Sequence, residues 1–160
     1  MFNLLDSHDT ARLTTTVGSE EKALQILTLL LAMPGSPCIF YGTELLLTGN
    51  EDPDCRICMP WADIDAGKYD DILNKIKNII ALRNDEPLFR CNHFYFNQNI
   101  NNDRVIEFIK EDTLGNNLEI ILNCSEKDVE LNLDKEILFS NLLEGNILQK
   151  DGILIFRRKA

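Results

Sequence analysis

The amino-acid sequence predicts an α/β part followed by an all-β part. Residues 1–86 alternate strand-like apolar runs with helix-like segments, whereas residues 87–160 contain only short strand-like runs. Pro87 stands where the pattern changes. A chain of 160 residues can hold one domain, or a small domain with part of another. We therefore expect two domains, over residues 1–86 and 87–160.

The α/β part begins with an expected strand, Phe2–Leu5, which we predict to be largely buried. Polar residues, Asp6 to Asp9, follow it directly. A helix is expected from about Glu20 to Met33, because Ser19 can cap its first turn and Pro34 follows its last residue. The apolar residues of this helix cover nearly its whole circumference in the second half, which predicts burial on more than one side.

A second strand and a second helix complete the α/β part. The aromatic run Cys38–Tyr41 predicts the strand, and an irregular segment, Thr43–Gly67, follows it. The helix is expected over Tyr69–Arg83, where isoleucines recur at helical spacing. Two βα units cannot cover both faces of a parallel sheet, so this part is interpreted as the tail of a larger α/β domain.

The all-β part contains candidate strands separated by turn-rich segments such as Asn99–Asp103 and Gly115–Asn117. The candidate strands are Phe94–Phe96, Val105–Lys110, Leu118–Leu122, Val129–Leu133, Leu138–Leu143 and Ile153–Arg157. Short strands at this spacing predict a small antiparallel β-sandwich.

The composition of the chain disfavours some classes of binding partner and indicates the compartment of the protein. A net charge of −10 disfavours nucleic acid and anionic membranes as partners, and it is compatible with a neutral ligand. Five cysteines without a regular framework indicate reduced thiols in a cytoplasmic protein. No signal-peptide pattern precedes the first strand, and the longest apolar run, Ile26–Met33, is too short to span a bilayer.

Three motifs carry a family resemblance. Asn3–Thr10, NLLDSHDT, resembles the fourth signature region of the α-amylase family of glycoside hydrolases, family 13. Met33–Glu44, MPGSPCIFYGTE, resembles the eighth strand of that family and its exit. Gly49–Arg56, GNEDPDCR, together with Met59–Trp61, MPW, resembles the branch of neopullulanases, cyclomaltodextrinases and maltogenic amylases. The motifs follow the order of the family at fitting distances.

The resemblance implies a fold and an activity. Residues 1–86 would be the last two βα units of an incomplete (β/α)8 TIM barrel, and residues 87–160 the C-terminal β-sandwich domain. The whole protein would be a retaining hydrolase of α-glucosidic bonds in maltooligosaccharides, cyclodextrins or related α-glucans. Its nucleophile and acid/base belong to earlier strands, so we expect this chain alone to be inactive. Exposed barrel surfaces predict that it self-associates or rearranges its first 90 residues.

The resemblance also implies site residues. Asp9 matches the third catalytic carboxylate, which binds sugar hydroxyls and helps to hold the distorted ring, and His8 matches a histidine that donates to the same sugar. Asp52 and Arg56 would bind sugar hydroxyls at a non-reducing subsite; the alternative is an ion pair that shapes the loop. Two further residues of these motifs are given other roles: we interpret Trp61 as a packing anchor rather than a sugar platform, and Glu44 as part of the turn.

Neither a metal nor a cofactor is expected. Cys55-x-x-Cys58 would need two further zinc ligands at suitable spacing, and His93 is the only histidine besides His8. The surplus aspartates indicate a solvated face and a helix start, without a D-x-D-x-D-G calcium loop. We interpret the cysteine pair as part of the D-P-x-C-R motif.

Some features leave alternatives open. Asp6 stands where the family often has glycine or another small residue, and Ile57-Cys58 intervene after Arg56, which leaves the subsite open. A second hypothesis is a non-catalytic carbohydrate-binding or structural β module. The few adjacent aromatic residues, Phe94–Phe96, argue against an extended sugar-binding platform.

Overall fold

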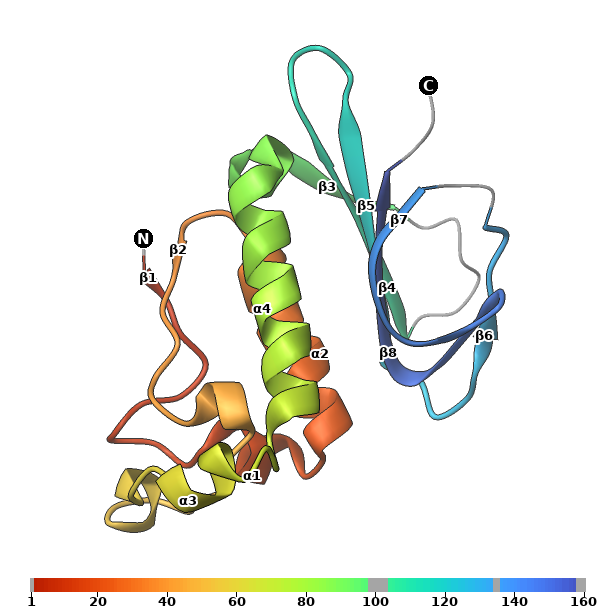
Figure 1. Cartoon of the computed structure of the whole chain (residues 1–160). Helices are drawn as coiled ribbons and strands as arrows, with labels where there is room; N and C mark the ends of the chain where they lie inside the picture. The colour runs from red at the N-terminus through yellow and green to blue at the C-terminus, as the bar shows by residue number, and fades with distance from the viewer. Residues whose placement is uncertain (1, 98–103, 134–135, 158–160) are drawn as a thin grey trace. The chain divides into compact units, whose positions relative to one another are not determined.

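The computed structural model describes residues 2–97, 104–133 and 136–157. The chain forms two compact units, Met1–Ala81 and Leu82–Ala160. The boundary between the units falls inside helix α4, Asp70–Asp85, which is the long green helix of Figure 1. The domain boundary expected from the sequence, after residue 86, stays a prediction. Among the described residues, no helix has the length and apolar character needed to cross a membrane.

The first unit contains short strands and helices of very different length. Its elements are β1 (Phe2–Asn3), α1 (Leu13–Val17), α2 (Glu20–Ala32), β2 (Ser36–Pro37), the 3-10 turns η1 (Thr43–Leu45) and η2 (Asp54–Arg56), α3 (Trp61–Asp65) and the larger part of α4. Strands β1 and β2 form a two-stranded parallel sheet. The strand–helix–strand–helix order expected from the sequence is present.

Helix α2 confirms the sequence-based expectation closely. The Ser19 hydroxyl oxygen accepts a hydrogen bond from the Lys22 amide at 3.1 Å, which caps the first turn. The helix ends at Ala32, just before Met33 and Pro34. Buried residues occur all along it from Ala23 to Ala32, as the two-sided apolar pattern predicts. Helix α4 likewise lies where the isoleucine spacing predicts it.

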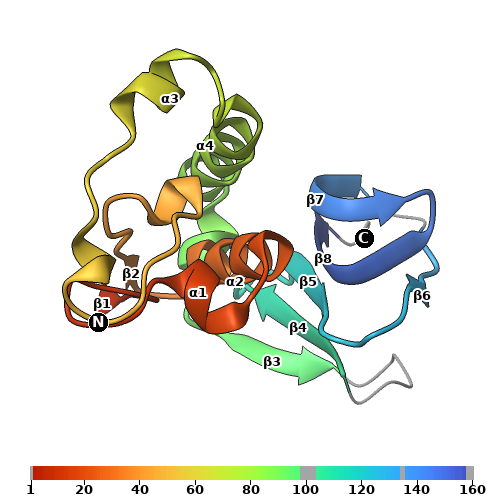
Figure 2. The same cartoon turned by 90° about the horizontal axis from the view of Figure 1, so that it is seen from below.

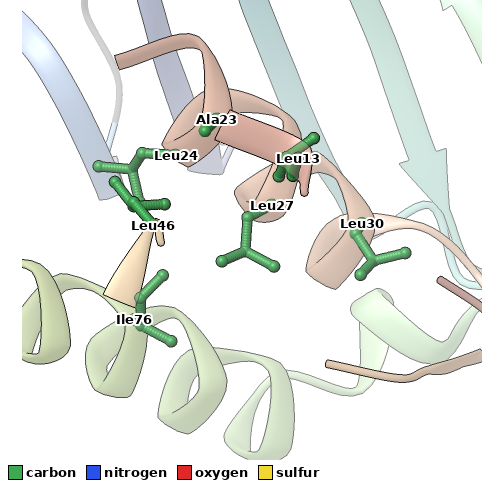
Figure 3. Packing of buried hydrophobic residues seen from close by; sticks show 7 residues of the cluster. All are labelled: Leu13, Ala23, Leu24, Leu27, Leu30, Leu46 and Ile76. Carbon is green, nitrogen blue, oxygen red and sulfur yellow. The ribbon is translucent and has the colours of Figure 1, made fainter. Parts of the chain in front are cut away.

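The core of the first unit gathers around α2. Figure 3 shows Leu24 of α2 beside Leu46, and Leu27 pointing into the space between α2 and α4. The buried cluster consists of Leu13, Ala23, Leu24, Leu27, Leu30, Leu46 and Ile76. Burial of these side chains stabilises the unit, at about 1.5–3 kcal/mol for each fully buried leucine or isoleucine.

The expected strands of this unit are shorter than the sequence suggests. Strand β1 ends at Asn3, and Phe2 is 80% exposed, so the prediction of a largely buried strand is wrong. Residues Cys38–Tyr41 are not a strand. The last hydrogen bond between this segment and β1 runs from the Cys38 amide to the Asn3 carbonyl at 2.8 Å, because β1 ends at Asn3. The aromatic residues that follow pack around a buried arginine instead.

Two short helices were not expected. Helix α1 forms after the polar residues Asp6–Asp9, and it ends at Gly18, whose φ of 76° is readily adopted by glycine. The segment Thr43–Gly67, expected to be irregular, contains η1, η2 and α3.

The second unit is built on one antiparallel sheet. After the 3-10 turn η3 (Pro87–Arg90), its strands are β3 (Phe94–Asn97), β4 (Val105–Glu111), β5 (Asn117–Asn123), β6 (Val129–Glu130), β7 (Glu136–Glu144) and β8 (Ile147–Arg157). They form a six-stranded sheet of order β3-β4-β5-β8-β6, with β7 also paired to β8. Figure 2 shows that this sheet curls strongly between β5 and β7. The prediction that this unit is a β-sandwich stays a prediction.

The strand positions largely agree with the sequence. Strand β6 is shorter than the expected Val129–Leu133, and β8 is longer than Ile153–Arg157. The added residues include Gln149–Gly152, which separate Ile147 and Leu148 from the apolar pattern of the expected strand. Register shifts in β7 between Ile137 and Phe139, and between Asn141 and Leu143, bend the pair. The expected turn Asn99–Asp103 lies outside the described residues.

Candidate functional site

A buried ion pair supports the loops that carry the site. The guanidinium Nε of Arg12 lies 3.4 Å from Oδ2 of Asp6, and both side chains are almost fully buried. The same Asp6 oxygen accepts from the Leu13 amide at 2.9 Å, at the start of α1, while Oδ1 accepts from the Thr43 hydroxyl at 2.6 Å. Asp6 therefore fixes the exit of β1 to α1 and to η1.

Arg12 joins further segments of the first unit. Its Nη2 donates to the Tyr41 carbonyl at 2.5 Å, and its Nη1 donates to the Cys55 carbonyl at 3.4 Å. The guanidinium lies 4.7 Å from the centroid of the Phe40 ring, within the range of cation–π attraction. The Arg12 amide donates to the Gly49 carbonyl at 2.9 Å. One buried side chain thus ties together the loops after β1, β2 and η1.

His8 and Asp9 project from the loop after β1. Nε2 of His8 lies 3.1 Å from Oδ2 of Asp9, and the side chains are 61% and 67% exposed. The loop is held locally, because the Ser7 amide donates to the Thr10 hydroxyl at 3.0 Å and the Asp9 amide to the Ser7 hydroxyl at 3.2 Å. The carboxylate is therefore open to a ligand on a turn that is hydrogen-bonded internally.

Arg56 links the third motif, Gly49–Arg56, to the first, Asn3–Thr10. Its Nη2 lies 3.5 Å from Oδ1 of Asp9, and its Nε lies 3.0 Å from Oδ1 of Asp52. The same Nε donates to the His8 carbonyl at 3.1 Å. All four residues singled out by the sequence therefore meet in one cluster. Asp52 and Arg56 do form the ion pair of the alternative interpretation. Sugar binding by these residues stays a prediction.

The cluster offers both acceptors and donors. The carboxylates of Asp9 and Asp52 can accept strong, charge-assisted hydrogen bonds from hydroxyl groups, and the guanidinium of Arg56 can donate to ring or hydroxyl oxygens. Because the side chains of Arg56, Asp9 and Asp52 are half or more exposed, their polar atoms can also bond the hydroxyl groups of a polyol. Such an arrangement suits a neutral carbohydrate.

The sequence predicts structural roles for Trp61 and Glu44. Trp61 is 65% exposed, and α3 buries none of its residues, so its interpretation as a packing anchor is wrong. The sequence could not show this, since an apolar side chain after Met-Pro is more often buried than exposed. Glu44 lies in η1, in the turn where the sequence places it.

The two cysteines of Cys55-x-x-Cys58 lie in different surroundings. All five cysteines are free thiols, and the described part of the chain has no group of three or more histidine, cysteine or acidic side chains arranged for a metal. Cys55 is buried, and its thiol donates to the His8 carbonyl at 3.1 Å, whereas Cys58 is exposed.

Sequence reasoning missed Arg12 and the thiol of Cys55 as parts of the site. Arg12 stands three residues after Asp9, but nothing in the local pattern separates a buried arginine from one on the surface. The contacts of both residues depend on loops distant in sequence, so the signal lies in the tertiary structure.

Comparison with known proteins gives a consistent picture. Residues 1–103 match a family model described as the alpha amylase catalytic domain. The chain is 51% identical over 87 residues to an intracellular maltogenic amylase of Bacillus subtilis (strain 168), covering 54% of this chain and 14% of that protein. It is 34% identical over 146 residues to a cyclomaltodextrinase of Thermoanaerobacter pseudethanolicus (strain ATCC 33223 / 39E), covering 91% and 23%.

Solved structures of proteins with the same names also resemble this chain. The chain resembles a maltogenic amylase from S. marinus with a TM-score of 0.77 and 27% identity, over 97% of this chain and 22% of that one. It resembles a cyclomaltodextrinase with a TM-score of 0.74 and 28% identity, over 98% and 29%. The chain thus spans less than a third of the length of these proteins.

Proposed function

The chain belongs to the alpha-amylase family, in the branch of maltogenic amylases, cyclomaltodextrinases and neopullulanases, and on that basis we propose that it is part of a longer retaining enzyme that cleaves α-glucosidic bonds. The proposed substrates are maltooligosaccharides, cyclodextrins or related α-glucans. The names of the relatives support this class, since they include a maltogenic amylase and several cyclomaltodextrinases.

We propose that the first unit is the last part of a (β/α)8 barrel. The parallel pairing of β1 with β2, each followed along the chain by helices, supports this assignment. In such a barrel, active sites lie at the carboxyl ends of the strands. His8 and Asp9 lie in the loop that follows β1, the position in which such a barrel carries its catalytic groups. The antiparallel unit would then be the C-terminal β domain.

The roles of the side chains follow from their chemistry. Asp9 accepts hydrogen bonds from sugar hydroxyls, and these bonds strengthen as the ring approaches an oxocarbenium-like transition state. His8 donates to the same sugar, while Asp52 and Arg56 hold a neighbouring ring. The observation that carries the proposal is Arg56, which lies within ion-pairing distance of both Asp9 and Asp52 and thereby unites two distant motifs.

This chain binds and orients the sugar, and other segments of the enzyme perform the bond cleavage. Retaining glycosidases need a nucleophilic carboxylate and an acid/base carboxylate about 5–5.5 Å apart. We assign neither role to a carboxylate of this chain, so the chain alone should be inactive. The reaction as proposed needs no cofactor. Free thiols and the intracellular relative support a cytoplasmic location.

An assay of the full-length protein that carries this chain tests the proposal. The protein is incubated with maltohexaose, β-cyclodextrin and pullulan, and the first products are followed by ¹H NMR. Hydrolysis of at least one of these substrates, with the α-anomer released first, is expected. A protein inactive on all three, or one that releases the β-anomer, would contradict the proposal. The 160-residue chain alone should release no glucose or maltose.

Binding to the chain distinguishes the alternative, a carbohydrate-binding β module. Titration of the 160-residue chain with maltoheptaose should show contacts at His8 and Asp9 if it shows any, and Asp9→Asn should weaken them. Binding that leaves these signals unmoved, with shifts confined to β3–β8, would favour the module.

A further inference from the structure

Cys55 is buried in η2, and no step of the proposed function uses it. The residue has no exposed surface, and it lies between the two oppositely charged residues Asp54 and Arg56 of the same 3-10 turn. Cys58, three positions on, is exposed. The two cysteines of the C-x-x-C sequence therefore lie in different environments.

The thiol of Cys55 contacts the loop that presents Asp9. Its Sγ lies 3.1 Å from the His8 carbonyl oxygen and donates to it. The same oxygen accepts from Nε of Arg56 at 3.1 Å. Two consecutive side chains of one turn thus hold a single carbonyl group. Because the peptide bond is planar, fixing the His8 oxygen also fixes the amide of Asp9.

The backbone of Cys55 is held by a second contact. Its carbonyl accepts from Nη1 of Arg12 at 3.4 Å, and Arg12 is itself anchored by the buried carboxylate of Asp6. Cys55 is therefore a bridge from the buried ion pair to the exposed His8–Asp9 turn. A buried thiol is a weak donor but loses no competing water contact there.

We propose that Cys55 is a positioning residue: its thiol orients the His8–Asp9 peptide so that the Asp9 carboxylate faces Arg56. The geometric part of this inference stands on the chain alone, and its consequence for catalysis rests on the proposed function. A misplacement of about 1 Å at a reacting group can cost roughly a hundredfold in rate. A modest hydrogen bond can therefore matter more to catalysis than to stability.

NMR of the 160-residue chain, with Phe2→Ser/Leu4→Asn in every sample to limit association through these exposed side chains, tests the geometry directly. Cys55→Ala removes the donor, Cys55→Ser restores one, and Cys58→Ala is the matched control. In Cys55→Ala we expect the ¹³C signal of the His8 carbonyl to shift and the Nε–H signal of Arg56 to exchange faster with water. Cys55→Ser should largely restore both signals, and Cys58→Ala should leave them unchanged. Unmoved signals in a folded Cys55→Ala chain would overturn the inference, as would equal shifts in the Ala and Ser variants.

Native-state alkylation of the wild-type chain gives a second test that needs no variant to fold. Iodoacetamide should modify Cys55 at least about tenfold more slowly than Cys58, because a buried thiol reacts only after local opening. Equal rates, read by mass spectrometry of the peptides, would contradict the buried contact.

Kinetics of the full-length protein separate this inference from the proposed function. Cys55→Ala should lower kcat/KM on maltohexaose about tenfold, mainly through kcat, with recovery in Cys55→Ser. A wild-type protein inactive on every α-glucan would refute the proposed function and leave the NMR result standing. An active wild type matched by Cys55→Ala would refute the positioning role alone.

Discussion

At the residue scale, the buried pair of Asp6 and Arg12 explains how a polar, exposed turn can be held in place. Asp6 departs from the small residue that the family often has there, yet its carboxylate accepts bonds from the Leu13 amide and the Thr43 hydroxyl. Arg12 extends that anchor to the Tyr41 and Cys55 carbonyls. The pair therefore anchors the loops that carry the exposed His8–Asp9 turn.

Loss of one partner should destabilise the first unit strongly. Arg12→Leu leaves the Asp6 carboxylate buried without its ion pair, a change that typically costs about 3–5 kcal/mol. Urea unfolding, followed by the helical circular dichroism signal, should show this loss. The double variant Asp6→Asn/Arg12→Leu should cost less than the two single changes added together, and strictly additive costs would argue against the pair.

Lys110 of β4 gives a pH-dependent prediction. Its side chain is buried, and its Nζ donates to the Phe89 carbonyl at 2.5 Å. Burial, with a smaller effect from the charge of Arg83, lowers the pKa of Lys110 from 10.5 to about 8, although Cys91 opposes the shift. Between these two pH values the unfolded chain binds more protons than the folded chain. The free energy of unfolding therefore gains a contribution that rises with pH.

The variant Lys110→Met should lack that contribution. Below about pH 8 the cost of the buried charge is fully present in the wild type, and it is relieved as the pH rises toward 10.5. The unfolding free energy of the wild type minus that of the variant should therefore increase across this window. Urea titrations at several pH values measure it, and a difference independent of pH would refute the shifted pKa.

At the element scale, Gly49 illustrates how the η2 loop is placed. A Cβ added at this residue would lie 2.5 Å from the Asp54 carbonyl oxygen and 2.9 Å from Cγ of Arg12. The first of these atoms belongs to the backbone at the start of η2, so it cannot be relieved by a side-chain rotation. Glycine is therefore required by close approach at this position.

Gly49→Ala should displace η2 and loosen the site. We expect a loss of about 1–3 kcal/mol in unfolding free energy, as for other overpacked positions, and faster alkylation of Cys55. Gly115→Ala is the control, since its φ of 84° adds backbone strain but its Cβ would meet open space. If Cys55 reacts at the same rate in the Gly49 variant and in the control, the close approach does not govern the loop.

Elements that depend on local pattern were predictable, and elements that depend on partners were not. The capping of α2 by Ser19 and the isoleucine spacing of α4 are local signals, and both helices form as expected. Cys38–Tyr41 has strand-like residues, but β1 ends too early to pair with them. The polar residues Gln149–Gly152 continue β8 between the stretch that pairs with β6 and the stretch that pairs with β5, which no local pattern reveals.

The residues of the candidate site also divide into those that the sequence predicts and those that it does not. His8, Asp9, Asp52 and Arg56 were predictable because they lie in motifs with a family resemblance. Arg12 and Cys55 were not, because their burial arises only when the loops after β1, β2 and η1 converge. The exposure of Trp61 was not predictable either, because the burial of this side chain depends on which segments pack against α3.

At the scale of the whole molecule, the first unit exposes apolar side chains at its N-terminal strand. Phe2 is 80% exposed and Leu4 is 54% exposed, on and just after β1. Exposed apolar residues beside a short strand favour association between chains.

We predict that the 160-residue chain self-associates at micromolar concentrations. Multi-angle light scattering should show species larger than a monomer, and the double variant Phe2→Ser/Leu4→Asn should reduce them. A stable wild-type monomer under the same conditions would contradict this expectation, and it would indicate that the first unit covers its own surfaces in solution.

The most direct test of the account is the effect of Asp9→Asn on kcat/KM of the full-length protein toward maltohexaose. Asp71→Asn on α4 is the control, because that aspartate is exposed and pairs with Lys75 far from the cluster in sequence. Loss of a group that stabilises the transition state should lower kcat/KM by about a hundredfold or more, with little change in the control. Equal kcat/KM values for the Asp9→Asn protein and the wild type would show that the cluster does not act on the sugar.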